Sequence, residues 1–584
     1  MPGNVSRRGF IHGVMAATTV CCSGYLSACV REDWLEVFPQ GLASGDPGSD
    51  SVMLWTRVQS PDTKPLSVEY EVALDERFTE VIASGSVIAE PDWDYTVRLR
   101  VEGLSPYTFY YYRFVARGSV SATGRTKTAP EKSQDVPVRF AVASCQDFVG
   151  RWYQSWRQLL EEPDVDFVLF LGDYIYETIA DPRHQMPQEN RRLTLPDGAA
   201  LSGAEGDFKA VTLADYRSLY KQYKTDPDLL EVHRRFPFVC IWDDHEFAND
   251  CWQDHATDTN ELYGTEQETA RREAATRAWF EFTPIDVPYQ EENSFPHDIQ
   301  IYRALRYGLH VDLVLTDLRY YRQDHLIPEG PLETGVGKFL ENSPLGSRIF
   351  AQKERFDERE AQVQPTMLGQ IQKEWLIDTL TQSDATWKIW GSALMVGQMA
   401  LDLREVEGMP ALFANHYYFK VDHWDGFRSE RQEILERLAE THNFLIVSGD
   451  LHGFYASRVA IQPDANPEDP AGAVVATEFT TSAISSIPLL DQLRSFTQQD
   501  PLLSSMELSP FVERLDELLL DSNPHFSHAD SAHNGVMIVD VDAHETAVCM
   551  VKLGDVTHPG TGSLLAPARF RVQAGSTDLR VVAE

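Results

Sequence analysis

The sequence predicts an α/β protein whose main domain is preceded by a small β-sandwich domain. Its length of 584 residues exceeds that of one typical domain. Near residue 128 the pattern changes from short alternating strands to continuous apolar runs separated by amphipathic helices. Most of these apolar runs end in a cluster of polar side chains, which is typical of the strand ends of layered α/β enzymes.

The first domain is expected over residues 34–127. Residues 51–57, 67–72 and 95–99 alternate between apolar and polar side chains, as half-buried strands do. The turn Leu104-Ser105-Pro106-Tyr107 precedes three tyrosines that begin at Tyr110, and this order is typical of the tyrosine corner of fibronectin-like β-sandwiches. Residues 128–137 are rich in charge and proline and indicate a linker.

The second domain is expected over residues 138–553, where apolar runs serve as buried strands. The runs end at Ser144-Cys145-Gln146, Gly172-Asp173-Tyr174, Asp243-Asp244-His245-Glu246, Asp317-Leu318-Arg319, Gly391-Ser392 and Gly449-Asp450-Leu451-His452. Carboxyl ends of parallel strands meet at one edge of a sheet. The repetition therefore predicts one convergent cluster of carboxylates, imidazoles and a thiol.

Two insertions interrupt this plan, and a tail follows it. Residues 178–212 predict a loop near the site, and residues 488–520 have helical periodicity typical of a lid or a packing insertion. Either insertion can shape a substrate cleft or be a neutral surface feature. Residues 554–584 are expected as a C-terminal extension with a short strand at 568–572.

The N-terminus indicates export. Arg7 and Arg8 precede an apolar stretch of small residues at 14–20, which is the layout of a twin-arginine signal read by the twin-arginine export machinery. The segment ending at Cys29 resembles a bacterial lipobox, so residues 1–29 predict a signal with lipidation at Cys29 and membrane anchoring. A plain cleaved signal and an uncleaved anchor are the alternatives. The expected location is the periplasm or the cell envelope.

The composition argues against duplex nucleic acid as a partner, and the cysteines outside the signal region permit a disulfide. A formal net charge of −38 argues against binding to duplex nucleic acid, which requires a basic surface. Outside the signal region the cysteines are Cys145, Cys240, Cys251 and Cys549. Cys240 and Cys251 can form a disulfide in an oxidising compartment, or can remain thiols.

The polar clusters contain the residue types that a two-metal phosphoesterase needs. Two cations mask phosphoryl charge and activate water, and a bridging carboxylate holds them about 3.5–4 Å apart. Asp173, freed by the turn at Gly172, is the expected bridge, and Asp450 with His452 can point the same way. His245 can protonate the leaving group; a structural ion pair between Asp244 and His245 is the alternative.

The order of motifs resembles the alkaline phosphatase D family of calcineurin-like metallophosphoesterases. The motifs are Ala143-Ser144-Cys145-Gln146, Gly172-Asp173-Tyr174-Ile175-Tyr176, Asp243-Asp244-His245-Glu246, Gly449-Asp450-Leu451-His452, Gly45-Asp46-Pro47, Leu54-Trp55-Thr56-Arg57, Met367-Leu368-Gly369 and Trp424-Asp425-Gly426. The resemblance spans residues 38–550. It implies a four-layer metallophosphoesterase-like sandwich after the fibronectin-like domain.

The resemblance also implies roles for individual residues. Cys145 and Tyr176 would bind Fe³⁺, and Asp173 would bridge it to a second metal, often Ca²⁺, held by Asp244. Asp450 and His452 would complete the ligand set.

Other positions are less firmly placed by the resemblance. Arg319 or Arg322 would contact substrate phosphate. Taken alone, Cys145 and Tyr176 would be ordinary core residues. The middle histidine of standard metallophosphoesterases is not evident; Ser392 or Asn415 is expected in its place, or a calcium ion with oxygen ligands only.

The expected function is hydrolysis of phosphomonoesters, phosphodiesters or both by a metal-activated hydroxide, with Asp173 and His245 in the catalytic group. A phospholipase D-type phosphodiesterase is the alternative, and an apolar rim on residues 488–520 would favour it. An inactive, surface-anchored binding module is the alternative from another class, although all six proposed metal ligands are present. A nuclease is a third possibility that the acidic charge disfavours.

Overall fold

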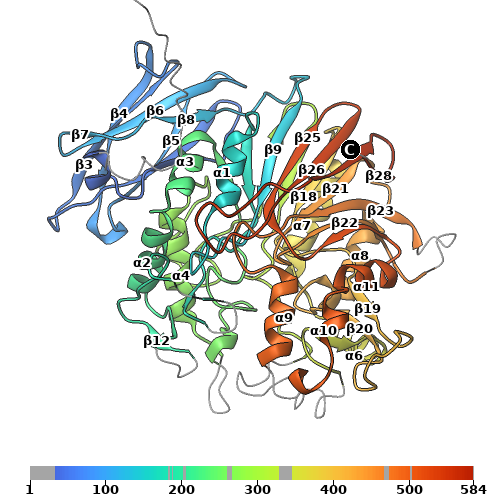
Figure 1. Ribbon diagram of the computed structural model, residues 1–584. Helices are drawn as coiled ribbons and strands as arrows, with labels where there is room; N and C mark the ends of the chain where they lie inside the picture. The colour runs from blue at the N-terminus through green and yellow to red at the C-terminus, as the bar shows by residue number, and fades with distance from the viewer. Residues whose placement is uncertain are drawn as a thin grey trace, which may run out of the picture.

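Two large β-sheets packed face to face form the centre of the molecule. The computed structural model describes residues 33–181, 185–186, 188–201, 206–259, 266–327, 345–465, 472–499 and 503–582. Helices cover the outer faces of both sheets, and a smaller β-sandwich adjoins one end (Figure 1). The predicted α/β sandwich with a preceding β domain is therefore confirmed. The predicted signal and Cys29 lie outside the described residues.

The first large sheet has ten strands. Their order is β28 (Leu579–Val581), β27 (Ala568–Gln573), β26 (Glu545–Leu553), β25 (Asn534–Val541), β9 (Val138–Ala143), β10 (Phe167–Phe170), β14 (Phe238–Cys240), β1 (Leu42–Gly45), β2 (Ser51–Arg57) and β5 (Thr96–Glu102). The strands β9, β10, β14 and β1 are mutually parallel. Strands β9, β10 and β14 are almost wholly apolar because both of their faces are covered.

The second large sheet has seven strands. Their order is β15 (Arg303–Tyr307), β16 (Val311–Leu315), β18 (Trp387–Gly391), β21 (Phe444–Ser448), β23 (Val474–Thr480), β22 (Phe454–Ala460) and β24 (Phe526–Asp530). Strands β16, β18, β21 and β23 are parallel. Their carboxyl ends therefore lie along one edge, as the sequence predicts.

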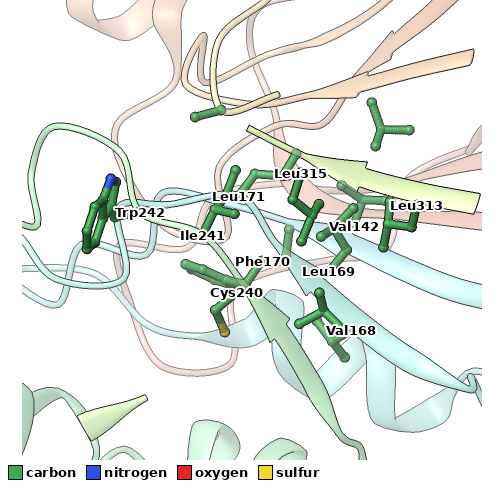
Figure 2. Close-up of a cluster of buried hydrophobic side chains, with 14 of the residues drawn as sticks. Val142, Val168, Leu169, Phe170, Leu171, Cys240, Ile241, Trp242, Leu313 and Leu315 are labelled. Atoms are coloured by element: carbon green, nitrogen blue, oxygen red, sulfur yellow. The ribbon is translucent and has the colours of Figure 1, made fainter. Parts of the chain in front are cut away.

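The core between the sheets is built from branched aliphatic and aromatic side chains. Figure 2 shows Val142 and Leu169 of the first sheet, and Leu171 directly after β10, lying near Leu313 and Leu315 of β16. All five side chains are at most 1% exposed. Burial on this scale is the main favourable term that holds the two sheets together.

Helices cover both outer faces. Those near the first sheet are α1 (Gln154–Glu161), α2 (Leu213–Tyr223), α3 (Pro227–Arg235) and α4 (Thr269–Phe282); those near the second are α6 (Lys353–Val363), α7 (Gly369–Gln382) and α8 (Arg428–Arg437). Thr212 and Asp215 form a capping box that begins α2, and Asp226 with Pro227 begins α3. Among the described residues, no helix combines the length and apolarity that a membrane span requires.

The N-terminal region contains the expected sandwich. Its outer sheet has β4 (Val81–Ala89), β3 (Leu66–Ala73), β6 (Phe109–Ala116), β7 (Ser119–Val120) and β8 (Gly124–Lys127). The Tyr110 hydroxyl accepts a bond of 2.7 Å from the Ser105 amide, which is the geometry of the predicted tyrosine corner. Its other sheet, β1-β2-β5, is continuous with the ten-stranded sheet.

The insertions and the tail form defined elements. Residues 178–212 contribute β11 (Thr178–Ile179), β12 (Ala199–Ala200) and β13 (Phe208–Lys209), and residues 488–520 contain α9 (Leu489–Gln499), the turn Leu503–Ser505, α10 (Ser509–Val512) and most of α11 (Leu515–Ser522). A separate sheet joins β17 (Phe350–Gln352), β20 (His416–Phe419) and β19 (Ala400–Asp402). Strand β27, expected within a C-terminal extension, pairs with β26 and so belongs to the main sheet.

Candidate metal centre

The carboxyl ends of both large sheets meet at one place. Ser144, directly after β9, pairs in parallel with Ala483, which follows β23. The Gly449 amide, after β21, donates to the Ala393 carbonyl at 3.1 Å, and Ala393 follows β18. This junction brings residues that are far apart in the sequence to one site.

Four of the predicted ligands share an uncommon backbone conformation. Cys145, Asp173, Asp450 and His452 have φ values of 56°, 59°, 64° and 51°. The left-handed region costs a non-glycine residue on the order of 1–3 kcal/mol, and such strain concentrates at functional sites. Here it turns each side chain sharply out of the strand direction at the strand's end.

Glu246 holds two of the strand ends together. Its carboxylate accepts from the amides of Asp173 (3.0 Å), Tyr174 (2.6 Å) and Asp243 (2.8 Å). These bonds connect the turn after β10 with the turn after β14. Glu246 therefore fixes the spacing between Asp173 and the adjacent acidic pair.

One side of Asp173 faces a thiol, a phenol and an imidazole. Its Oδ2 lies 3.4 Å from Cys145 Sγ and 3.3 Å from the Tyr176 hydroxyl, which is 3.3 Å from His452 Nε2. His452 Nδ1 lies 2.7 Å from the Ile487 carbonyl and can donate to it, which leaves Nε2 directed at the cluster. Cys145, Asp173 and His452 offer ligand atoms within 4.8 Å of one another.

The other side of Asp173 faces carboxylates. Asp173, Asp243, Asp244 and Asp450 form a second group whose ligand atoms all lie within 4.8 Å of one another. Asp244 belongs to a further group with Asp250 and Asp422. Asp173 and Asp244 also form a group with His245. Asp173 thus belongs to a mixed-donor group with a thiol and an imidazole and to a group of four carboxylates.

Burial favours the protonated forms of three donors, although His245 acts in the opposite direction at Asp173. Burial raises the pKa of Asp173 well above its usual range, and the neighbouring carboxylates add to the shift. Burial, then Asp173, likewise raises the pKa of the Cys145 thiol and of the Tyr176 phenol. Burial lowers the pKa of His452 to about 4, so its imidazole is neutral and suited to metal binding. This donor chemistry fits a bound cation pair, which reverses such shifts.

His245 lies beside the shared carboxylate, oriented by a buried partner. Its Nδ1 is 2.6 Å from Oε2 of Glu177, and its ring packs on Tyr176 at 4.1 Å between centroids. Burial acts to lower the pKa of His245, but Glu177, Asp244 and Asp173 together raise it well above the ordinary value. The geometry suits an imidazolium with Nδ1 anchored and Nε2 free to donate.

The predicted phosphate contact by Arg319 or Arg322 requires correction. Both side chains have no exposed surface. Arg319 bonds Asp243 at 2.7 Å and Asp422 at 2.9 Å, and Arg322 pairs with Asp422 at 3.1 Å. The two guanidinium groups lie behind the carboxylates and neutralise them, because each is already committed to buried anions.

Two further residues lie at the centre that the sequence did not predict. His423 Nε2 lies 2.5 Å from Asp450 Oδ2, and the Lys420 ammonium pairs with the same oxygen. Ser392 and Asn415, expected in place of the missing histidine, make local bonds: Ser392 donates to the Leu394 carbonyl, and the Asn415 side chain accepts from the His416 amide. The signal for His423 was its position directly before the noted Trp424-Asp425-Gly426 motif.

Cys240 and Cys251 are both buried free thiols. The disulfide between them, which the sequence left open, is absent from the described structure. Cys251 lies 3.8 Å from the Asp244 carbonyl and so packs behind the acidic half of the centre.

A four-layer α/β sandwich with acidic, thiol and imidazole donors at joined strand ends defines the class of metallophosphoesterases. The family model for PhoD-like phosphatases matches residues 140–550, and that for the N-terminal domain of PhoD-like phosphatases matches residues 27–130. The chain belongs to the PhoD-like phosphatase family and is a hydrolase of phosphoric esters.

Individual relatives agree with this assignment. Alkaline phosphatase D of Bacillus subtilis (strain 168) is 28% identical over 559 residues, which cover 93% of this chain and 82% of the relative. A solved structure of PhoD matches with a TM-score of 0.73 and 26% identity, covering 94% of this chain and 92% of that chain. The predicted family and enzyme class are confirmed, and an inactive binding module is not supported.

Proposed function

We propose that the enzyme hydrolyses phosphomonoesters and phosphodiesters at an iron–calcium centre. Cys145, Asp173, Tyr176 and His452 would hold Fe³⁺, and Asp173, Asp244 and Asp450 would hold Ca²⁺. The observation that carries the proposal is the position of Asp173: its Oδ2 lies near the thiol and the phenol, and its carboxylate also forms a group with Asp243, Asp244 and Asp450, whose ligand atoms lie within 4.8 Å of one another. Thiolate and phenolate are anionic donors that suit an oxidised iron, and the group of four carboxylates suits calcium.

When bound, the cations would supply positive charge for the phosphoryl oxygens and would lower the pKa of bound water, so that hydroxide is available near neutral pH. The chain itself supplies the acid. Glu177 fixes Nδ1 of His245, so the proton on Nε2 is available to the oxygen of the leaving alcohol. Glu177, which is not among the proposed metal ligands, raises the pKa of this imidazole and so favours its protonated form.

Lys420 is proposed as the phosphate-facing cation in place of Arg319 and Arg322. Its side chain is 26% exposed, whereas those of the two arginines are fully buried. It follows β20 directly and reaches Asp450 at the acidic half of the centre. An ammonium at that position can turn to a phosphoryl oxygen of the bound substrate.

Export is part of the proposal. The twin arginines at Arg7 and Arg8 and the lipobox-like segment at Cys29 support passage through the twin-arginine machinery and anchoring by an acylated cysteine. That route carries folded proteins, so the centre can acquire its metals before export. The proposed location is the periplasm or cell envelope.

Metal analysis combined with turnover tests the centre. The purified enzyme should contain iron and calcium and absorb visible light through thiolate- or phenolate-to-iron charge transfer. Cys145→Ser should lose or shift that band and Asp173→Ala should lose both metals and all hydrolysis, whereas the control Cys549→Ser should match wild type. A colourless, iron-free enzyme with full turnover on matched monoester and diester substrates would refute the iron assignment.

A further inference from the structure

A buried segment crosses from the second large sheet to the metal centre. Residues 481–488 follow β23 directly, and both large sheets hold them in place. The Thr481 hydroxyl donates to the Val142 carbonyl at 3.1 Å, and the Ile484 amide donates to the Ser144 carbonyl at 2.9 Å. The backbone of this segment is therefore fixed before it reaches the proposed ligands.

Ser486 lies within this segment, and its hydroxyl contacts a proposed iron ligand. Its Oγ donates to the Tyr176 hydroxyl oxygen at 2.7 Å, and Tyr176 in turn donates to Asp173 Oδ2 at 3.3 Å. The Asp147 amide donates to the same Oγ at 3.0 Å, and Ser486 is only 1% exposed. Because Oγ already accepts from this amide, its own proton is directed at another oxygen.

A serine hydroxyl has one proton, and two oxygen acceptors lie within its reach. The Cys145 carbonyl is 2.9 Å from Ser486 Oγ, but this carbonyl also accepts from the Ser486 amide at 3.2 Å. Tyr176 as a metal ligand would be a phenolate, which has lost its own proton and only accepts hydrogen bonds. Because a charge-assisted bond is roughly twice as strong as a neutral one, the phenolate is the favoured acceptor.

The same segment also orients the imidazole donor. His452 Nδ1 lies 2.7 Å from the Ile487 carbonyl, and the Asn534 side chain donates to the Ser486 carbonyl at 2.8 Å. Two consecutive residues therefore hold two proposed iron ligands. Ser486 contacts Tyr176 through its hydroxyl, and Ile487 contacts His452 through its carbonyl.

We propose that Ser486 is a positioning residue of the iron site, whose hydroxyl donates a hydrogen bond to the Tyr176 phenolate and so limits its electron donation to the metal. The inference rests on the proposed iron centre and adds a residue that is not itself a ligand. Hydrogen-bond partners of this kind orient ligands and tune the metal. The phenolate oxygen carries more negative charge on ferrous than on ferric iron, so the bond stabilises the ferrous form more strongly.

Ser486→Ala in the holoenzyme tests this role. The charge-transfer band should move to longer wavelength, because the phenolate loses more stabilisation in the ground state than after its charge has passed to the iron. The ferric-to-ferrous ratio at a fixed potential should rise about tenfold, which is a fall of about 59 mV in the reduction potential. Spectroelectrochemical titration of the purified enzyme without substrate measures both changes.

Ser485→Ala is the matched control. Ser485 has the same side chain in the same buried segment, but its hydroxyl donates to the Asp147 carbonyl at 2.7 Å. Its band and potential should equal those of wild type, and Ser486→Thr, which keeps a hydroxyl, should restore the wild-type band. Equal shifts in Ser485→Ala and Ser486→Ala would overturn the assignment, because they would show a general effect of the segment.

A measurement on the wild-type enzyme does not depend on the folding of any variant. Resonance Raman spectra are excited in the charge-transfer band after the enzyme is loaded with iron in H₂O or in D₂O. The phenolate modes should shift on deuteration, because the proton that Ser486 donates to the phenolate oxygen is exchanged. Identical phenolate modes in the two solvents would overturn the proposal.

These readouts need no substrate, so they separate the inference from the proposed function. A wild-type band and potential in Ser486→Ala, together with normal hydrolysis of 4-nitrophenyl phosphate, would overturn the role of Ser486 and leave the proposed function intact. The full shift in an enzyme without phosphoesterase activity would support the role of Ser486 and refute the proposed hydrolysis.

Discussion

Arg319 donates to Asp243 and Asp422 from a side chain that has no exposed surface. Burial acts to raise the pKa of Asp422, but Arg319 and Arg322 together hold it well below the ordinary value. The two arginines therefore keep Asp422 ionised from positions that have no exposed surface. A family motif can place such a residue near a site, but only the fold shows which way its charge is directed.

Replacing Arg319 by methionine should lower the free energy of unfolding by about 3–5 kcal/mol, because Asp243 and Asp422 would remain buried without their partner. Urea denaturation of the metal-free protein measures this loss. The control Arg437→Met removes an exposed pair with Glu374 and should cost less than about 1 kcal/mol. Unchanged stability with a raised KM for Arg319→Met would instead restore the phosphate-binding role.

At Lys224 burial determines the pKa, whereas at Asp422 the neighbouring charges do. Its ammonium lies 4.7 Å from the Trp55 ring and 4.8 Å from the Tyr174 ring, and burial lowers its pKa to about 7 from 10.5. Between these two pH values the unfolded chain binds a proton that the folded chain has released. The free energy of unfolding therefore rises with pH across this window.

Lys224→Met should stabilise the protein most at or below pH 7, where the wild-type lysine is charged in both states. The expected gain at pH 6 is a few kcal/mol, at about 1.4 kcal/mol per unit of pKa shift, less the lost cation–π contacts. The gain should fall towards zero near pH 10. Thermal melting of both proteins at pH 6, 8 and 10 measures it; a gain independent of pH would contradict the assigned burial cost.

At the scale of elements, strand ends were predictable and loop contributions were not. The runs before Asp173, Asp244 and Asp450 are apolar enough to identify as buried parallel strands, so their convergence follows from topology. Lys420 and His423 follow β20, a four-residue strand of a small separate sheet. This strand is too short to be identified in the sequence as a buried strand whose end would point to these residues. Cys145 and Tyr176 could be assigned a metal only through family resemblance, because isolated thiols and phenols are usually core residues.

The turn after β10 depends on a glycine. Gly172 has φ of +105°, and a Cβ there would lie 2.4 Å from the Asp243 amide nitrogen. Gly172→Ala should therefore cost on the order of 3 kcal/mol or more through combined strain and overlap, and should reduce metal content. Gly103→Ala, with φ of +77° and open space around it, should cost only about 1 kcal/mol. Urea denaturation and metal analysis compare the two; equal losses would show that the close approach is unimportant.

At the scale of the whole molecule, the N-terminal region is structurally merged with the catalytic region. Strands β1, β2 and β5 extend the ten-stranded sheet, so the sandwich predicted for residues 34–127 shares its inner sheet with the main domain. Trp55 Nε1 donates to the Glu281 carbonyl at 2.7 Å in the buried junction, and Arg303 pairs with Asp46 at 2.7 Å. The change of sequence pattern near residue 128 predicts two regions, but it cannot show that they share one sheet.

Because the regions share a sheet, the chain should unfold in one cooperative transition. Trp55→Ala should lower the midpoint of that whole transition. The substitution leaves a buried cavity, which costs about 3–5 kcal/mol of stability, and it removes the donor to the Glu281 carbonyl. Val120→Ala, at a position that is 46% exposed in the outer sheet, should have little effect. A chain lacking residues 33–127 would expose the β1-facing edge of β14 and should aggregate without a cooperative melt. Calorimetry of the full chain and its variants tests whether unfolding is one cooperative transition. Two separate transitions, or a stable truncated chain, would show that the sandwich folds independently.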